Sequence, residues 1–220
     1  MEYNIVMTGS QGNAVILNDF ILVDCGVPFK ALEECYKALK IVLLTHRHTD
    51  HFKKRTISKL ARERPSLYFC CCEWLVDELI KCKVEKKNII VMEIGKVYDF
   101  GACKVSPVKL YHDVRQCGWR IYIGDEKAIY ATDTAHMDGI LAKDYNLYMI
   151  EGNYHEDELQ ERIREKQEKG EFCYEYRVPK THLSVEQATA WLMENMGENS
   201  EYVLMHRHID KEERNANEGD

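Results

Sequence analysis

A short stretch near residue 46 contains four side chains that can bind a metal ion. Directly after the apolar run IVLL, the segment THRHTDH offers His46, His48, Asp50 and His51. Imidazole nitrogen and carboxylate oxygen are ligands that Zn²⁺ takes alongside thiolate, and Mn²⁺ accepts them too. A strand that ends in such a loop brings these side chains to the edge of a sheet. The segment therefore predicts one half of a metal centre.

Three later residues are candidates for the other half. His112 follows VKLY, Asp133 closely follows AIY, and His206 follows YVLM, so each lies where a predicted strand ends. Taken singly, each is better explained as a turn aspartate (Asp133) or a surface histidine (His112 and His206). Together with the first group, they predict ligands that converge at one edge of a sheet. The segment MHRHID also contains His208, and we expect His206 to bind because it directly follows the strand.

The rest of the chain supplies elements that can position these residues. Apolar runs split at Asn18-Asp19 and at Gly124-Asp125 predict two hairpins. Apolar residues at helical spacing predict a helix over residues 29–39. Further helices are predicted over residues 51–65, where Pro65 ends the helix, over 73–82, over the highly charged segment 156–170, and over 184–196 with Ser184 as the N-cap. Strands and helices alternate, but many neighbouring strands form hairpins. This pattern favours an α/β fold with mixed or antiparallel sheets and helices outside.

Composition narrows the class of protein. The chain has 220 residues, 45% of them hydrophobic, which suits a single domain over residues 1–209 followed by a polar, frayed tail over residues 210–220. A net charge of −7 excludes binding of nucleic acid by the whole surface. Phosphate could still be held locally by Lys53, Lys54 and Arg55, by the lysines between 81 and 87, and by Arg207. The nine cysteines form no CxxC pair, and no signal peptide or membrane span is evident, so we expect reduced thiols, a cytoplasmic location and no membrane partner.

The motifs resemble a known family. HRHTDH is similar to the HxHxDH signature of the metallo-β-lactamase-fold hydrolases, and His112, Asp133 and His206 follow in the order of that superfamily's further ligand motifs. In order along the chain, TGSQGNAVIL, THRHTDH, YHD, ATDT, EGNYH and THLS resemble the YycJ-type subgroup, which looks like a group of single-domain DNA exonucleases related to RNase Z and RNase J. The resemblance implies a four-layer αβ/βα sandwich of two mixed β-sheets flanked by helices.

The resemblance also implies a role for each residue. His46, His48 and His112 would bind a first metal ion, Asp50, His51 and His206 a second, and Asp133 would bridge both. His182, in THLS, would touch the scissile phosphate or protonate the leaving oxygen, so His182 and Asp50 are the expected catalytic residues. Asp24, in FILVDCG, would not bind metal but would accept hydrogen bonds from the metal loop, the segment that carries His46 to His51. Glu151 is a weaker candidate for the rim of the site.

The expected function is that of a binuclear metal-dependent phosphodiesterase, specifically a nuclease that acts on the ends of nucleic acid, DNA rather than RNA. Two divalent ions, Zn²⁺ or alternatively Mn²⁺, would hold a hydroxide between them and lower the pKa of its parent water from 15.7 toward ~7. One alternative is a metal-dependent hydrolase of a small ester, thioester, lactone or lactam on the same fold. A second is a binding protein that keeps the scaffold without catalysis.

Overall fold

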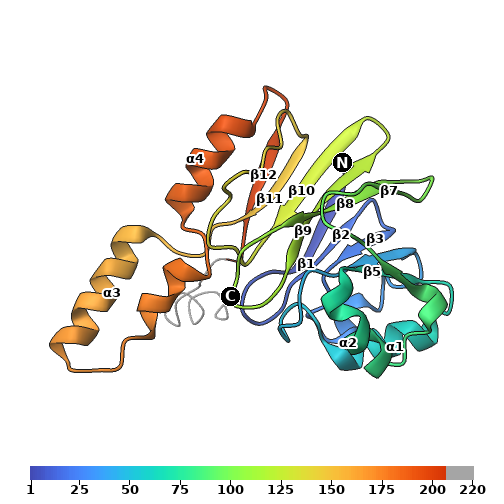
Figure 1. The fold of residues 1–220 in the computed structure, drawn as a ribbon, viewed down its shortest axis with the longest axis horizontal. Coiled ribbons are helices and arrows are strands. Elements are labelled where there is room, and N and C mark those ends of the chain that lie inside the picture. The colour runs from blue at the N-terminus through green and yellow to red at the C-terminus, as the bar shows by residue number, and fades with distance from the viewer. Residues whose placement is uncertain (207–220) are drawn as a thin grey trace.

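The computed structural model describes residues 1–206, which form two six-stranded β-sheets with helices outside (Figure 1). The first sheet has the strand order β1-β2-β3-β4-β5-β6. Its strands span Tyr3–Met7, Ala14–Leu17, Ile21–Val23, Ile41–Leu43, Tyr68–Cys71 and Ile89–Val91. Strands β1 to β3 pair antiparallel and β3 to β6 pair parallel, so the sheet is mixed, as expected.

The second sheet has the strand order β12-β11-β10-β9-β8-β7. From β7 to β12, its strands span Tyr98–Asp99, Lys104–Lys109, Cys117–Ile123, Glu126–Ala131, Leu147–Glu151 and Glu201–Met205. Strands β7 to β10 pair antiparallel, whereas β10, β11 and β12 pair parallel. Both predicted hairpins are present, as β2–β3 and β9–β10.

The buried side chains divide into layers because successive residues of a strand point to opposite faces. In the first sheet, Val15 and Val23 pack in the cluster between the sheets, where they meet residues such as Trp119 of the second sheet. Their neighbours Ile16 and Leu22 pack instead in a cluster on the outer face. A further cluster covers the outer face of the second sheet. The predicted four-layer sandwich of two mixed sheets flanked by helices is therefore confirmed.

Four α-helices of residues 1–206 lie outside the sheets. They are α1 (Lys54–Glu63), α2 (Val76–Lys81), α3 (Glu156–Glu168) and α4 (Val185–Asn195). Helices α1 and α2 pack on the first sheet through Ile57, Leu60 and Leu79, and α4 packs on the second through Ala188 and Leu192. The predicted N-cap of α4 is confirmed, because Ser184 and Gln187 form a reciprocal capping box.

The helix predicted over residues 29–39 is wrong. Only Phe29–Leu32 form a 3₁₀ helix, η1, and the chain then continues in turns. Most of the backbone hydrogen bonds here join residues three apart, as from Glu33 N to Lys30 O and from Ala38 N to Cys35 O. This geometry is poorer than that of an α-helix, so such runs stay short. The apolar spacing is instead used to bury Leu32 and Leu39.

Further 3₁₀ helices are η2 (Glu73–Leu75) and η3 (Lys86–Asn88). Helix α3 and the 3₁₀ helix η4 (Tyr174–Lys180) form an arm that projects from the sandwich on the left of Figure 1. Within residues 1–206, no helix is both long and apolar enough to cross a bilayer. The predicted tail over residues 210–220, the domain boundary at residue 209, Arg207 and the alternative ligand His208 lie outside the described residues.

Candidate metal centre

All seven predicted ligands come together at one edge of the sandwich. The loop between β4 and α1 carries His46, His48, Asp50 and His51, and the segments after β8, β10 and β12 carry His112, Asp133 and His206. They form two groups: one with His46, His48 and His112, the other with Asp50, His51, Asp133 and His206. Within each group, the candidate ligand atoms all lie within 4.8 Å of one another.

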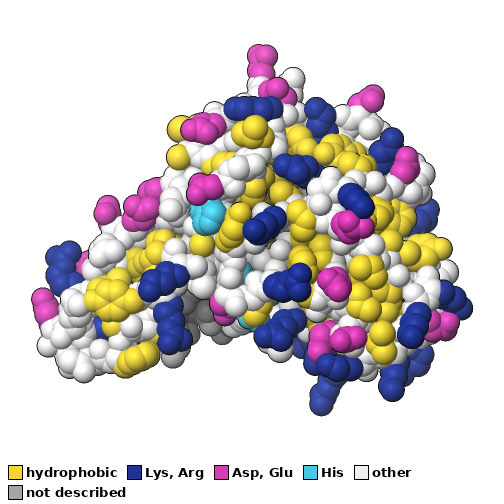
Figure 2. All heavy atoms as spheres, viewed as in Figure 1, with side chains coloured by type: hydrophobic (Ala, Val, Ile, Leu, Met, Phe, Trp, Pro, Cys, Tyr) yellow, Lys and Arg dark blue, Asp and Glu magenta, His cyan; other side chains and the backbone are white. Residues whose placement is uncertain are grey.

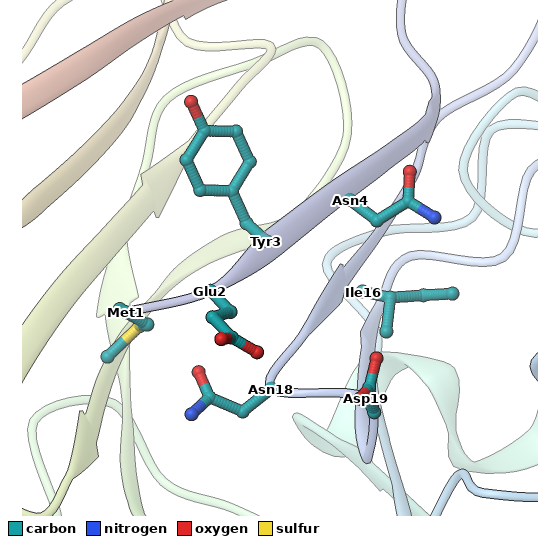
Figure 3. A pocket seen from close by; sticks show the side chains of 7 residues that line it. All are labelled: Met1, Glu2, Tyr3, Asn4, Ile16, Asn18 and Asp19. Atoms are coloured by element: carbon teal, nitrogen blue, oxygen red, sulfur yellow. The ribbon is translucent and has the colours of Figure 1, made fainter.

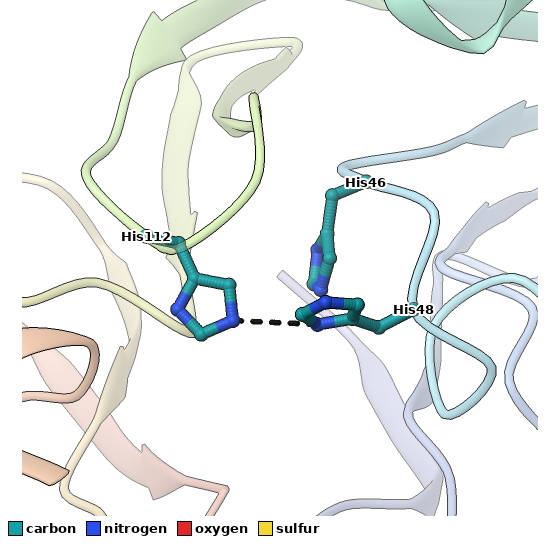
Figure 4. Close-up of side chains that lie close together, drawn as sticks. All are labelled: His46, His48 and His112. Carbon is teal, nitrogen blue, oxygen red and sulfur yellow. Dashed lines mark hydrogen bonds between the residues drawn. The ribbon is translucent and has the colours of Figure 1, made fainter. Parts of the chain in front are cut away.

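The three histidines of the first group turn their rings toward a common point (Figure 4). His112 Nδ1 lies 2.8 Å from the carbonyl oxygen of Thr181, so Nδ1 carries the proton and Nε2 keeps its lone pair. His112 Nε2 in turn lies 3.3 Å from His48 Nδ1. His46 uses Nδ1 to contact the Thr45 hydroxyl at 2.9 Å, which leaves its Nε2 directed at the site. This group can therefore offer three imidazole nitrogens to one cation.

Asp133 connects the two groups. Its Oδ2 lies 2.6 Å from His51 Nε2 in the second group and 3.4 Å from His46 Nε2 in the first. Its Oδ1 lies 3.2 Å from His206 Nδ1, and His206 Nε2 lies 3.4 Å from Asp50 Oδ2. One carboxylate that reaches both groups has the position needed to bridge two cations.

Asp24 lies beneath the metal loop, where the sequence predicts a supporting carboxylate. Its Oδ2 accepts a hydrogen bond from His51 Nδ1 at 2.6 Å, and its Oδ1 accepts from both the backbone N–H and the hydroxyl of Thr45. The contact with His51 fixes the ring so that Nε2 faces the site. Because Asp24 is fully buried, its hydrogen bonds are held in a region that water does not reach.

The backbone around the site is constrained. Asp24, Asp133 and His206 have φ values of 58°, 54° and 56°, in the left-handed region that residues other than glycine rarely adopt. Such strain is concentrated at functional sites. Gly26 is required for a different reason, because a Cβ there would lie 1.7 Å from the carbonyl oxygen of Asp50.

The residues present fit divalent cations. Two fully buried polar atoms, His46 Nε2 and Asp133 Oδ1, have no hydrogen-bond partner, although Asp133 Oδ1 has imidazole nitrogens nearby. Unpaired buried polar atoms are rare and costly in native structures. Both atoms belong to residue types that bind Zn²⁺ or Mn²⁺. A cation coordinated at this position would satisfy both of them.

The electrostatics favour the same interpretation. Burial, reinforced by the nearby His51, holds the pKa of His46 well below its ordinary value, so the ring is neutral. Burial alone would raise the pKa of Asp133, but the adjacent His51 and His206 hold it well below the usual range. Burial also opposes a charge on His206, yet the carboxylate of Asp133 raises its pKa to about 10. A cation that binds His206 must therefore displace a proton.

His182 and Glu151 form a pair beside the second group. His182 Nδ1 lies 2.7 Å from Glu151 Oε1, and its side chain is 21% exposed. Glu151 is fully buried, not at the rim as the sequence predicts, and it also accepts hydrogen bonds from the backbone N–H groups of Thr134 and Leu183. Burial lowers the pKa of His182, but the hydrogen bond that its Nδ1 donates to Glu151 outweighs burial and raises the pKa. The motif EGNYH marks Glu151 in the sequence. Its hydrogen-bond partner His182 lies 31 residues further along the chain, so the sequence alone does not reveal the pair.

Two metal ions should bind per chain, and Asp50→Ala should retain one. Asp50 touches only the second group, and at 22% side-chain exposure it packs little of the core, so its loss should remove a contact and leave the fold intact. Elemental analysis of protein purified without chelator checks this. The matched control is Asp138→Ala, an aspartate whose side chain is 87% exposed. If His206→Ala kept both ions and His208→Ala lost one, the choice of His206 would be wrong.

A hollow of about 390 Å³ elsewhere on the surface has none of this chemistry. It lies at the start of β1 and the β2–β3 turn, and its lining contains no histidine and no predicted site residue (Figure 3). The candidate ligands are therefore concentrated at the edge of the sandwich.

Comparisons with known proteins give the family of the chain. The family model described as the beta-lactamase superfamily domain matches residues 20–207. Exodeoxyribonuclease YycJ of Bacillus anthracis is 24% identical over 169 residues, which cover 70% of this chain and 63% of that protein. The chain thus spans less than two thirds of the length of this relative.

Solved structures with the same architecture include the metallo-beta-lactamase fold protein YhfI from Bacillus subtilis. It is 18% identical with a TM-score of 0.72, over 98% of this chain and 90% of that one. The short form of human tRNase Z is 15% identical with a TM-score of 0.70, over 94% and 92% of the two chains. These likenesses establish the metallo-β-lactamase fold, and the family match shows that the chain belongs to the beta-lactamase superfamily, the hydrolase family predicted from its sequence.

Proposed function

We propose that the chain is a binuclear metal-dependent phosphodiesterase that hydrolyses nucleic acid, DNA in preference to RNA, from an end. Family membership supports a metal-dependent hydrolase, and the exodeoxyribonuclease name of the relative from Bacillus anthracis supports DNA. The observation that carries the proposal is the Glu151–His182 pair beside the predicted ligands. All nine cysteines are free thiols, as in proteins of reducing compartments, so the proposal includes a cytoplasmic location.

In this proposal the seven ligands hold two divalent ions, Zn²⁺ or alternatively Mn²⁺. When bound, such ions supply a nucleophile near neutral pH and neutralise charge on the phosphate. Asp133 keeps its negative charge and holds the two groups of ligands together. Asp24 holds the His51 ring in the orientation that ligation needs.

The Glu151–His182 pair provides the proton that the leaving oxygen requires. Glu151 accepts from His182 Nδ1 and raises the pKa of the imidazole, so the ring carries a proton more readily. The Nε2 atom of His182 then donates this proton to the oxygen that departs from phosphorus, which is general acid catalysis. The pair suits phosphodiester cleavage because an alkoxide that departs from phosphorus needs a proton, and the exodeoxyribonuclease name of the relative favours phosphate over lactone or lactam substrates.

Several of the lysines predicted to hold phosphate form ion pairs with neighbouring glutamates. Lys54 and Lys81 both pair with Glu78, and Lys87 pairs with Glu85. Dark blue and magenta side chains alternate over much of the face in Figure 2. Paired charges of this kind suit a solvated surface better than a phosphate track, so the lysines between 81 and 87 are not part of the proposed nucleic-acid site.

The decisive experiment is a substrate panel with defined metals. Protein loaded with Zn²⁺ or Mn²⁺ should hydrolyse bis(p-nitrophenyl) phosphate and degrade end-labelled DNA, and it should act more slowly on RNA. Nitrocefin and a simple lactone serve as substrates for the alternative hydrolases. Turnover of the lactone or nitrocefin without turnover of any phosphodiester would overturn the proposal. A lack of turnover with every substrate, despite two bound ions, would favour a binding protein.

A further inference from the structure

The arm formed by α3 and η4 leads directly into the candidate site. Leu159 and Ile163 of α3 pack on Tyr154 at the root of the arm, together with Val178 of η4. Tyr154 also bridges to Ser184, the N-cap of α4, so the root is tied to the sandwich. His182 follows η4 by two residues. A ligand that contacts the arm therefore lies close to the proposed proton donor.

A cavity of about 380 Å³ lies between this arm and the candidate metal centre. On the arm side its lining includes Arg162, Tyr174 and Arg177, and on the site side it includes His182 and His206. The cavity is thus continuous with the residues proposed to handle the scissile phosphate. Its volume lies at the lower end of the range for small-molecule sites, about 300–1,000 Å³. This volume suits one nucleotide rather than a longer stretch of chain.

The lining has the chemistry that recognises a nucleotide. Tyr174 is 50% exposed, and the Lys166 ammonium lies 4.4 Å from the centre of its ring. Within residues 1–206, the Arg177 guanidinium has no ion-pair partner, whereas Glu175 next to the cavity is neutralised by Lys166. Aromatic rings stack on bases, and arginine binds phosphate. Figure 2 shows hydrophobic side chains beside Lys and Arg side chains on this arm.

We propose that this cavity binds the single terminal nucleotide on the leaving-group side of the scissile phosphate. The base stacks on Tyr174 and the flanking phosphate contacts Arg177. The proposal rests on the proposed function, because it takes His182 as the donor to the leaving oxygen. Since His182 lines the cavity and stacks on the predicted ligand His206, the departing fragment is the one on the cavity side.

The reaction then releases one nucleotide at a time. Water supplies a hydroxide that bonds to phosphorus, and the bond from phosphorus to the leaving oxygen breaks with its electron pair on that oxygen. The leaving oxygen takes a proton from His182, which regains one from solvent, so one water is consumed for each nucleotide released. A cavity that accommodates one nucleotide and is lined on its far side by the arm makes the protein act on ends.

Direct binding tests this subsite independently of turnover. Isothermal titration of the zinc-loaded protein with thymidine 5′-monophosphate and with inorganic phosphate compares a nucleotide with the phosphate alone. Tyr174→Ala should weaken nucleotide binding about tenfold, the usual loss when one base no longer stacks. Binding of inorganic phosphate should hardly change, because phosphate does not reach the ring. Arg177→Gln should weaken nucleotide binding as well, and Tyr174→Phe should retain it.

Matched controls are Tyr202→Ala, a tyrosine that is 53% exposed on β12, and Arg62→Gln, an arginine whose side chain is 73% exposed on α1. Both should bind the nucleotide like the unmodified protein. Equal affinities of the Tyr174→Ala variant and the unmodified protein for the nucleotide would overturn the subsite, whatever the protein hydrolyses. Failure to hydrolyse bis(p-nitrophenyl) phosphate with normal nucleotide binding would overturn the proposed function and leave the subsite standing.

Discussion

Asp133→Asn should cost the protein both metal ions and reduce turnover by more than about 10⁴-fold, beyond the largest usual effect of losing a general acid. Among the described carboxylates, Asp133 alone lies within ion-pair distance of imidazole nitrogens from both predicted groups, His46 in the first and His51 and His206 in the second. An amide is neutral and offers one acceptor oxygen in place of two, so it binds two cations far more weakly than a carboxylate does. Loss of the bridge therefore affects both positions at once.

Asparagine is the informative replacement because of the backbone. Asp133 has a φ of 54°, and Asn is among the few residues other than glycine that enter this region readily. Alanine would add backbone strain to the loss of charge and would confuse the two effects. The asparagine variant keeps the shape of the side chain and isolates the carboxylate.

Elemental analysis, circular dichroism and hydrolysis of bis(p-nitrophenyl) phosphate together check this prediction. Asp144→Asn is a close control, because Asp144 is exposed and has a φ of 53° but lies outside the ligand groups. It should keep both ions and full turnover. Retention of two ions by Asp133→Asn would show that Asp133 is not the bridge. Retention of one ion would assign it to a single metal.

Local patterns predicted much of the fold because the signals involved are short-range. The turn at Asn18-Asp19 marked its hairpin, and both residues adopt positive φ. The parallel pairing of β10, β11 and β12 carried no such signal, since β11 and β12 are joined through the arm and α4. For that part of the sandwich, the architecture was predicted from the resemblance to a family and not from the spacing of apolar residues. In the segment over residues 29–39, by contrast, a local pattern predicted an α-helix that does not form. Turns bury Leu32 and Leu39 there instead.

Some residues of the candidate site could be predicted from a local motif, whereas others depend on contacts that folding creates. THRHTDH is a compact pattern whose residue types have a shared use in metal binding, so four candidate ligands could be read from one loop. Glu151 is a single carboxylate at a strand end, and its importance lies in contacts with His182, Thr134 and Leu183 that only the folded chain creates. Burial decides its role, because a carboxylate with no access to water must act through its neighbours.

His182→Ala should keep both metal ions and lower the rate on DNA by about 10²–10⁴-fold, the usual contribution of general acid catalysis. His182 Nδ1 is held by Glu151 at 2.7 Å, which leaves Nε2 to face the substrate. The loss should be smaller for bis(p-nitrophenyl) phosphate, because p-nitrophenolate is a good leaving group and needs little protonation. Equal losses on both substrates would instead indicate that His182 binds phosphate.

A second variant separates the proton donor from a metal ligand. Asp133, Glu151, His182 and His206 also lie close enough together to hold a cation, so the pair could belong to a coordination sphere. Glu151→Gln keeps the size of the side chain but removes the charge that raises the pKa of His182. If His182 is the proton donor, Glu151→Gln should lose rate on DNA, and adding His182→Ala should cost little more, since the two residues act as one unit. Metal content should stay at two equivalents in both single variants. Loss of an equivalent from His182→Ala would reject the assignment and make His182 a ligand.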